Sequence, residues 1–206
     1  MSETSERFPL FPLGLVLLPG EVVPLHIFEE RYKAMIGECL DQGTEFGIVW
    51  SGEEGIRDVG CAAEVAQLIE RTEDGRMNIL VKGTRRFTLE RRIEDLPYPA
   101  GDVTWMEDVV ADEAADSGAG ARKAYADLVE RVTDTRPDEA DLTELDAYGM
   151  ASTIAFDPGE KQGLLELVTE DERLKLLASL CTTALENLAR SQEAAERAAT
   201  NGKVHH

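Results

Sequence analysis

The sequence is poor in basic side chains. Its 206 residues hold 21 Lys and Arg against 41 Asp and Glu, which gives a formal net charge of −20. Proteins bind nucleic acids mainly by neutralising phosphates with Lys and Arg, so we expect no nucleic-acid partner. Anionic membrane surfaces would repel the chain for the same reason. The charge itself indicates a solvated acidic surface that keeps the protein soluble.

Cysteine and histidine are also scarce. Cys39, Cys61 and Cys181 lie far apart and form no CxxC pair, which excludes a disulfide framework and a structural zinc site and fits a reducing compartment. His26 is the only histidine apart from the two that end the chain. A Ser-His-Asp triad would have to use it, but its apolar, proline-bearing surroundings predict a packed, hydrogen-bonded side chain. We therefore expect no metal and no cofactor.

Long apolar runs and catalytic motifs are missing as well. The longest uncharged run, residues 8–20, has 13 residues and three prolines, which is too short and too broken to span a bilayer. The acidic N-terminus is not a signal peptide, so we expect a cytoplasmic protein. GxxxxGK[ST], GxGxxG, HExxH and GxSxG are all absent, which argues against an enzyme of those classes.

The first hundred residues alternate apolar and polar side chains in the manner of strands. The expected strands cover residues 8–13, 22–28, 46–50, 61–69, 77–81, 87–93 and 102–107. Prolines in the first two of these strands predict sheet edges, bulges or strand ends. Residues 29–41 instead carry an apolar stripe at helical spacing, and Gly43 is placed to end that helix. Such strands indicate a closed or half-closed antiparallel sheet with one embedded helix.

The second half reads as helices. Residues 107–121 hold acids, Ala, Ser and Gly with little to bury, which is typical of a linker. Asp157-Pro158-Gly159-Glu160 and Thr169-Glu170-Asp171-Glu172 are helix-start signals. We therefore expect a β-rich subdomain over 1–110, an acidic Ala/Gly loop over 111–120, and a helical subdomain over 121–206 that ends in a long helix.

Few residues suggest chemistry of their own. Cys39 and Cys181 lie on apolar helix stripes and are expected to fill the core, as is Cys61. The pairs Arg85-Arg86 and Arg91-Arg92 form the one gathering of cations. Pairing with carboxylates across strands is the expected role. An anion or peptide-carboxylate contact is the alternative.

Three stretches resemble the N-terminal substrate-binding domain of the Lon ATP-dependent proteases. The stretches are residues 11–20 (FPLGLVLLPG) with 24–32 (PLHIFEERY), residues 59–65 (VGCAAEV) with 74–87 (DGRMNILVKGTRRF), and residues 159–167 (GEKQGLLEL) with 172–174 (ERL). The resemblance spans residues 8 to 190, with Cys61 where Thr is usual and Leu18 where Phe is common. Glu29, Arg31 and Tyr32 match the motif, and we interpret them as structural.

The resemblance implies an α+β fold: a PUA-like antiparallel β pseudo-barrel with one embedded helix, followed by a C-terminal helical bundle. It also implies a non-catalytic role in which the protein engages unfolded or client polypeptides and works beside a protease or chaperone. The chain ends near where the ATPase module of such proteases begins, so we expect neither ATP hydrolysis nor peptide cleavage. We expect a monomer or weak homodimer.

An apolar patch in the first fifty residues would suit such a role, although the same side chains could complete the core. The candidate peptide-binding residues are Phe11, Leu17, Leu18, Pro19, Phe28 and Trp50. Two alternatives remain open. A small enzyme would need an acidic cleft with perturbed carboxyl groups, and an RNA-binding PUA-like module would need a basic face.

Overall fold

A computed structural model describes residues 3–109 and 117–201. The strands are β1 (Thr4–Leu13), β2 (Val22–Ile27), β3 (Phe46–Gly52), β4 (Gly55–Ile56), β5 (Val59–Arg71), β6 (Met77–Ile93) and β7 (Ala100–Trp105). The helices are α1 (Glu30–Gln42), α2 (Ser117–Thr133), α3 (Glu139–Glu144), α4 (Ala147–Ala151), α5 (Pro158–Glu166) and α6 (Glu170–Asn201).

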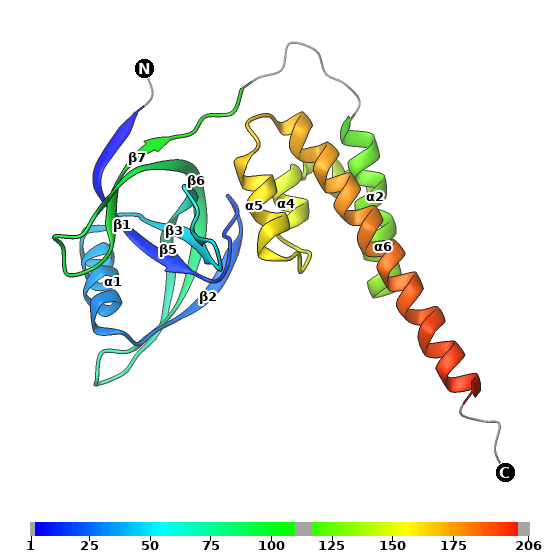
Figure 1. Cartoon of the computed structure of the whole chain (residues 1–206), viewed down its shortest axis with the longest axis horizontal. Helices are drawn as coiled ribbons and strands as arrows, with labels where there is room; N and C mark the ends of the chain where they lie inside the picture. The colour runs from blue at the N-terminus through cyan, green and yellow to red at the C-terminus, as the bar shows by residue number, and fades with distance from the viewer. Residues whose placement is uncertain (1–2, 110–116, 202–206) are drawn as a thin grey trace. The chain divides into compact units, whose positions relative to one another are not determined.

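The strands close into a pseudo-barrel (Figure 1). Antiparallel pairs join β1 to β7, β7 to β6, β6 to β5 and β5 to β3, and a parallel pair between β1 and β3 closes the ring. Strand β2 pairs only with β6 among the described strands. The expected α+β class, with an antiparallel barrel and an embedded helix, is confirmed.

Strand β1 changes partner halfway along its length. Residues Thr4 to Pro9 pair with β7, whereas Leu10 to Leu13 pair with β3. Each half is therefore paired along one edge, so the N–H group missing from Pro9 or Pro12 leaves no gap in a two-sided ladder. Pro24 lies in β2, which is an edge strand as its proline predicts. Beyond Pro9, strands β1 and β7 no longer pair with each other.

Strand β6 runs through Gly83 without a break, although the sequence predicted two strands separated by this glycine. The residue pairs with Ala63 of β5 and lies against the loop that precedes β2. A Cβ atom on Gly83 would stand 2.2 Å from the carbonyl oxygen of Leu18. Backbone bonds of 2.8 and 2.9 Å join Gly83 to Gly20 and Glu21. Gly83 thus allows backbone to approach backbone inside a continuous strand.

Helix α1 covers one side of the barrel and has the expected apolar stripe (Figure 1). Its buried face consists of Tyr32, Met35, Ile36 and Cys39. Gly43 ends the helix at φ 64°, a left-handed conformation that glycine adopts without steric cost. A second part of the core, centred on Phe8, Phe87 and Trp105, has ring centroids 5.2 to 6.2 Å apart in edge-to-face contacts.

The chain forms two compact units, and their composition differs from the expected subdomains. The first unit contains Met1–Val109 together with Tyr148–Val168, and the second contains Val110–Ala147 and Thr169–His206. Residues 148–168 thus join the β-rich unit, whereas the sequence placed them in the helical subdomain. Of the expected 111–120 loop, residues 111–116 lie outside the described residues, and Ser117 to Gly120 form the first turn of α2.

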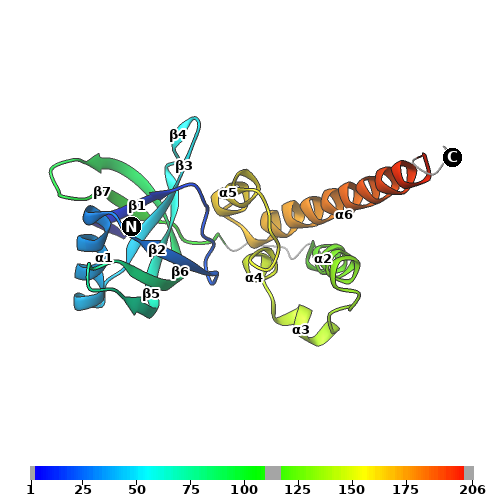
Figure 2. The same cartoon turned by 90° about the horizontal axis from the view of Figure 1, so that it is seen from below.

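The second unit is built on a pair of helices. Helices α2 and α6 lie side by side in both views (Figures 1 and 2). Leu177 and Cys181 of α6 are buried, as are Ala121, Tyr125 and Leu128 of α2. Thr169 caps α6 by accepting a 3.3 Å bond from the Glu172 amide, as the sequence predicted. The expected long final helix is 32 residues long.

Candidate functional site

A hollow of about 570 Å³ lies in the first unit, where β1 leaves β7 and moves to β3. This volume is within the range of ligand pockets in proteins. Its lining consists of Leu10, Pro12, Arg31, Tyr32, Val49, Ser51, Ile56, Leu89, Arg92, Ile93, Glu94, Leu96, Pro97, Tyr98, Pro99 and Ala100. We call this feature the β1 hollow.

The β1 hollow has a buried apolar floor and a partly exposed rim of apolar and polar residues. Core residues such as Leu10 and Val49 form the floor, at 3% and 0% exposure. Ile93, Leu96 and Pro99 are half-buried and line the rim. A side chain that enters from solvent would therefore contact apolar surface on several elements, and such burial is favourable.

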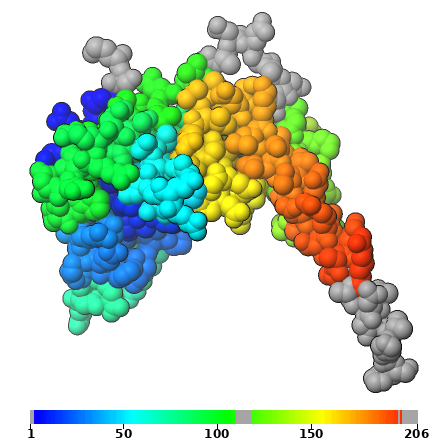
Figure 3. All heavy atoms as spheres, in the orientation of Figure 1, coloured from blue at the N-terminus to red at the C-terminus, as the bar shows by residue number. Residues whose placement is uncertain are grey.

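One wall of the hollow is the β6–β7 loop, residues 94–99, which is fastened to α1. The Tyr98 hydroxyl donates a 2.7 Å hydrogen bond to Oε2 of Glu38. The space-filling view shows the green atoms of the β6–β7 region adjoining the blue atoms of α1 (Figure 3). Burial, followed by the hydrogen bond to the Glu38 carboxylate, raises the pKa of Tyr98 to about 12. The bond therefore persists through neutral pH.

The lining of the β1 hollow is mixed, because polar side chains stand beside the apolar ones. Arg31, Arg92 and Glu94 are its charged residues. Arg31 donates a 2.9 Å bond to Glu29 and lies over the Tyr32 ring, 4.6 Å from its centroid. Glu29, Arg31 and Tyr32 thus form local contacts at the start of α1, which agrees with their structural interpretation.

Three of the six predicted peptide-binding residues lie in the core. Phe11 is 6% exposed, and its ring centroid is 4.1 Å from that of Tyr32. Leu17 and Leu18 are 1% and 0% exposed. These side chains complete the core, which was the alternative interpretation of the same apolar run.

The other three predicted residues are accessible but do not line the β1 hollow. Pro19 is half-buried, and Phe28 is 60% exposed beside His26, with 5.9 Å between ring centroids. Trp50 is half-buried beneath the Arg57 guanidinium, 5.5 Å from the ring centroid. No observation tests peptide binding by these residues, and the variant Phe28→Glu described below tests the exposed one.

The rim of the hollow was missed by sequence reasoning. The segment Leu96-Pro97-Tyr98-Pro99 was interpreted only as the end of a strand run. Its signal was the presence of apolar and aromatic residues between prolines, in a loop that has no strand periodicity to bury them.

Most arginines of the cluster Arg85, Arg86, Arg91 and Arg92 pair with carboxylates of the protein itself. Arg85 pairs with Glu45 at 3.3 Å, and Arg91 pairs with Asp102 at 2.7 Å. Arg86 is buried and bonds to the Asp108 carboxylate. Pairing with carboxylates is thus as predicted, and the Arg91–Asp102 pair joins the neighbouring strands β6 and β7.

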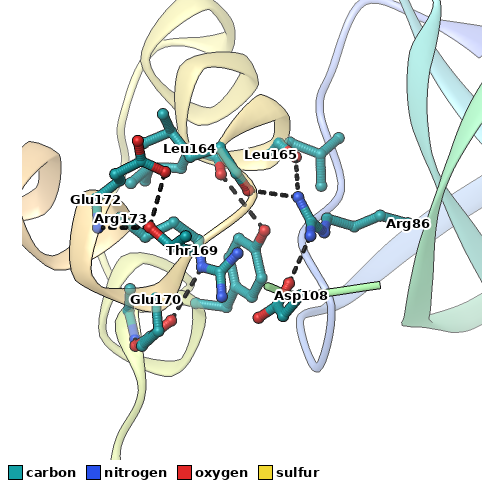
Figure 4. Close-up of polar contacts among 11 residues, drawn as sticks. Arg86, Asp108, Leu164, Leu165, Thr169, Glu170, Glu172 and Arg173 are labelled. Atoms are coloured by element: carbon teal, nitrogen blue, oxygen red, sulfur yellow. Dashed lines mark hydrogen bonds and ion pairs between the residues drawn. The ribbon is translucent and has the colours of Figure 1, made fainter. Parts of the chain in front are cut away.

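Arg86 also fastens the 148–168 segment to the barrel (Figure 4). Its guanidinium donates to the carbonyl oxygens of Leu165, at 2.9 Å, and of Leu167. A second buried pair joins Lys161 of α5 to Glu21, whose other oxygen accepts a 3.0 Å bond from the Leu18 amide. Helix α5 is thus held on the barrel by charge-assisted hydrogen bonds.

The described residues show no cluster of His, Cys, Asp and Glu that could hold a metal ion. The three thiols are buried and free. Burial raises the pKa of Cys61 to about 12 and that of Cys181 to about 11, so these thiols are poor nucleophiles at neutral pH. The pKa of Asp102 is lowered by bonds from Arg91 and Arg7, the opposite of what a general acid needs.

Among the described helices, none is long and apolar enough to cross a bilayer.

Relatives of the chain include several Lon proteases. The chain is 24% identical over 93% of its length to Lon protease 2 of Myxococcus xanthus, and 27% identical over 55% of its length to Lon protease of Parabacteroides distasonis. It spans 25% and 15% of those two relatives. The similarity thus covers a quarter or less of each protease.

Solved structures show the same fold. A Lon N-terminal domain protein from Xanthomonas campestris aligns with a TM-score of 0.64 and 26% identity, covering 86% of this chain and 98% of that one. The N-terminal domain of Mycobacterium avium complex Lon protease aligns with the same TM-score at 22% identity, covering 87% of this chain and 98% of that one. Residues 7–183 match the substrate-binding domain of the ATP-dependent protease La (Lon). The chain therefore belongs to the Lon substrate-binding domain family.

Proposed function

We propose that the protein is a non-catalytic module that binds unfolded polypeptides through exposed apolar segments, and that the β1 hollow is its binding site. The observation that carries this proposal is a hollow of about 570 Å³ with a buried apolar floor, within a fold of the Lon substrate-binding family. An extended segment could place one or two apolar side chains in a space of this size.

The proposal includes a partner and a location. A protease or chaperone would take over the bound clients, as the names of the relatives suggest. The cytoplasm is the proposed compartment because the chain has three free, buried thiols. We expect no nucleic-acid partner, no membrane association and a monomer or weak homodimer. Sedimentation across a concentration series tests the oligomeric state.

The test measures fluorescence anisotropy of labelled, permanently unfolded polypeptides against three matched apolar-to-Glu variants. Leu96→Glu puts a charge on the rim of the hollow and is expected to weaken binding about tenfold, because a buried unpaired charge is costly. Val132→Glu changes an exposed residue of α2 and is expected to leave affinity unchanged. All three variants add the same charge.

The third variant separates the two accessible surfaces. Phe28→Glu alters the exposed surface at the end of β2, which we call the β2 face and which lies outside the hollow. This variant is expected to bind as the wild type does. If Phe28→Glu abolishes binding and Leu96→Glu does not, the site belongs on the β2 face. If the wild type binds none of the polypeptides, the proposal of autonomous recognition is wrong.

A further inference from the structure

Arg92 differs from its neighbours in the arginine cluster because it has no ion pair among the described residues. Its guanidinium makes one polar contact there, a 3.3 Å bond to the carbonyl oxygen of Ile56. Arg85, Arg86 and Arg91 each bond to a carboxylate. In a chain with 41 acids and 21 bases, most arginines meet a partner, and this one is exposed at the rim of the β1 hollow instead.

The surroundings of Arg92 suit a carboxylate. A guanidinium presents a planar fork of N–H donors that matches the two oxygens of a carboxylate. Ile56, Ile93 and Leu96 line the same hollow, so an apolar segment bound there would shield part of the Arg92 guanidinium from water and strengthen the bond. Glu94 is the acid that also lines the hollow, so it opposes an incoming anion.

The position of Arg92 favours a segment that continues past it. Arg92, Ile93 and Glu94 also line a neighbouring hollow of about 430 Å³. Arg92 thus lies between the two hollows and not at the closed end of one of them. A chain end would fill one hollow, whereas an internal segment can extend along both.

We propose that Arg92 binds the side-chain carboxylate of an Asp or Glu within an extended, otherwise apolar segment of the client. This inference rests on the proposed function, because it names the class of segment that the β1 hollow selects. The apolar side chains of the client enter the hollow, and Arg92 selects among apolar segments by their charge.

The experiment uses three labelled peptides of equal length, apolar except for a central Glu, Gln or Lys, each blocked at both ends. Anisotropy is measured at about 0.15 M salt, where the Debye length of about 8 Å screens the repulsion from the acidic surface. We expect the Glu peptide to bind about tenfold more tightly than the Gln peptide, and the Lys peptide to bind more weakly than either.

Variants assign the preference to Arg92. Arg92→Gln is expected to bring the Glu and Gln peptides to within about twofold of each other, mainly by weakening the binding of the Glu peptide. Arg76→Gln removes the same charge in the β5–β6 turn, where Arg76 bonds to Asp74, and should keep the full preference. Glu94→Gln removes the opposing acid and should enlarge the preference.

The outcomes separate this inference from the function on which it rests. If no peptide binds, the proposed function fails, and the inference fails with it. If all three bind equally, or if the Glu preference survives Arg92→Gln, the function stands and the inference is overturned. A Gln peptide with a free C-terminal carboxylate that gains as much affinity as the Glu peptide would overturn the assignment to a side chain.

Discussion

Gly83 shows most clearly how one residue determines the local fold. A Cβ atom at this position would lie 2.2 Å from the Leu18 carbonyl oxygen and 3.1 Å from the Cys61 sulfur. We expect Gly83→Ala to lower the free energy of unfolding by about 3 kcal/mol, because the nearest obstacle is backbone and cannot rotate away. Urea denaturation measures the change.

Gly14→Ala is the matched control for that substitution. Apart from the adjacent residues of the chain, no atom lies within 4 Å of the Cβ position at Gly14. We expect the control to change stability by less than about 0.5 kcal/mol. Equal effects of the two substitutions would show that the close approach at Gly83 does not constrain the fold.

Single residues also mark the limit of prediction from the sequence. The stripe of α1 and its end at Gly43 were predictable because helical periodicity and a glycine signal are local. The burial of Leu17 and Leu18 was not, because strand-like apolar residues look the same in a core and in a binding groove. Arg92 could not be singled out, since carboxylate pairing depends on the register of distant strands.

At the scale of elements, the position of the 148–168 segment depends on Arg86, which holds this segment against the barrel. Arg86→Met keeps the apolar bulk but leaves two carbonyl oxygens without this donor. We expect a loss of about 2 to 3 kcal/mol, since buried unsatisfied groups are costly. Hydrogen exchange should accelerate in α5 before it does in the barrel strands.

Asp108→Asn provides the comparison for Arg86→Met. The Asp108 side chain is 48% exposed, so its contribution is screened by water, and we expect a cost below about 1 kcal/mol. If Asp108→Asn destabilises the protein as much as Arg86→Met does, the ion pair, and not the carbonyl contacts, fastens the segment.

The loop of residues 94–99 is the second element with a testable fastening. Tyr98→Phe removes the bond to Glu38 and should weaken client binding a few-fold, because the wall of the hollow is no longer fixed to α1. Relaxation measurements by NMR should show more motion in the loop and none added in the β2–β6 pair. If the loop becomes more mobile but the affinity for the client does not change, this wall of the hollow is not part of the binding site.

The pH dependence of this fastening follows from the tyrosine. The pKa of Tyr98 is raised from 10.0 to about 12, so the folded state favours the neutral phenol. Its contribution is complete below pH 10 and is lost as the pH rises through about 12. Burial also raises the pKa of Tyr32, so ultraviolet absorbance titration of Tyr98→Phe should lack one late-titrating phenol that the wild type shows and keep that of Tyr32.

Elements were predicted better than their grouping. The alternation of apolar and polar residues indicated the strands, and Pro24 indicated that β2 is an edge strand, because both signals act within a few residues. The membership of 148–168 in the β-rich unit depends on contacts made by Arg86 and Glu21, far away in sequence. Such pairings leave no local pattern in either segment.

At the scale of the whole molecule, the rate at which the buried thiols react measures how often the protein unfolds. Cys39 and Cys61 are buried in the first unit and Cys181 in the second, and burial raises the pKa of each. We expect all three to react slowly with a disulfide reagent at neutral pH and quickly in denaturant. Rapid reaction of one thiol in native buffer would reveal a local opening at that position.

Chemical-shift mapping by NMR, with an unlabelled apolar peptide added to the isotope-labelled protein, tests the central proposal most directly. The β1 hollow predicts that the largest shifts fall on residues of its rim, such as Ser51, Ile93 and Leu96, and that Phe28 and the second unit change little. Saturable shifts centred on Phe28, or none at peptide concentrations that saturate the anisotropy signal, would contradict the assignment of the binding site.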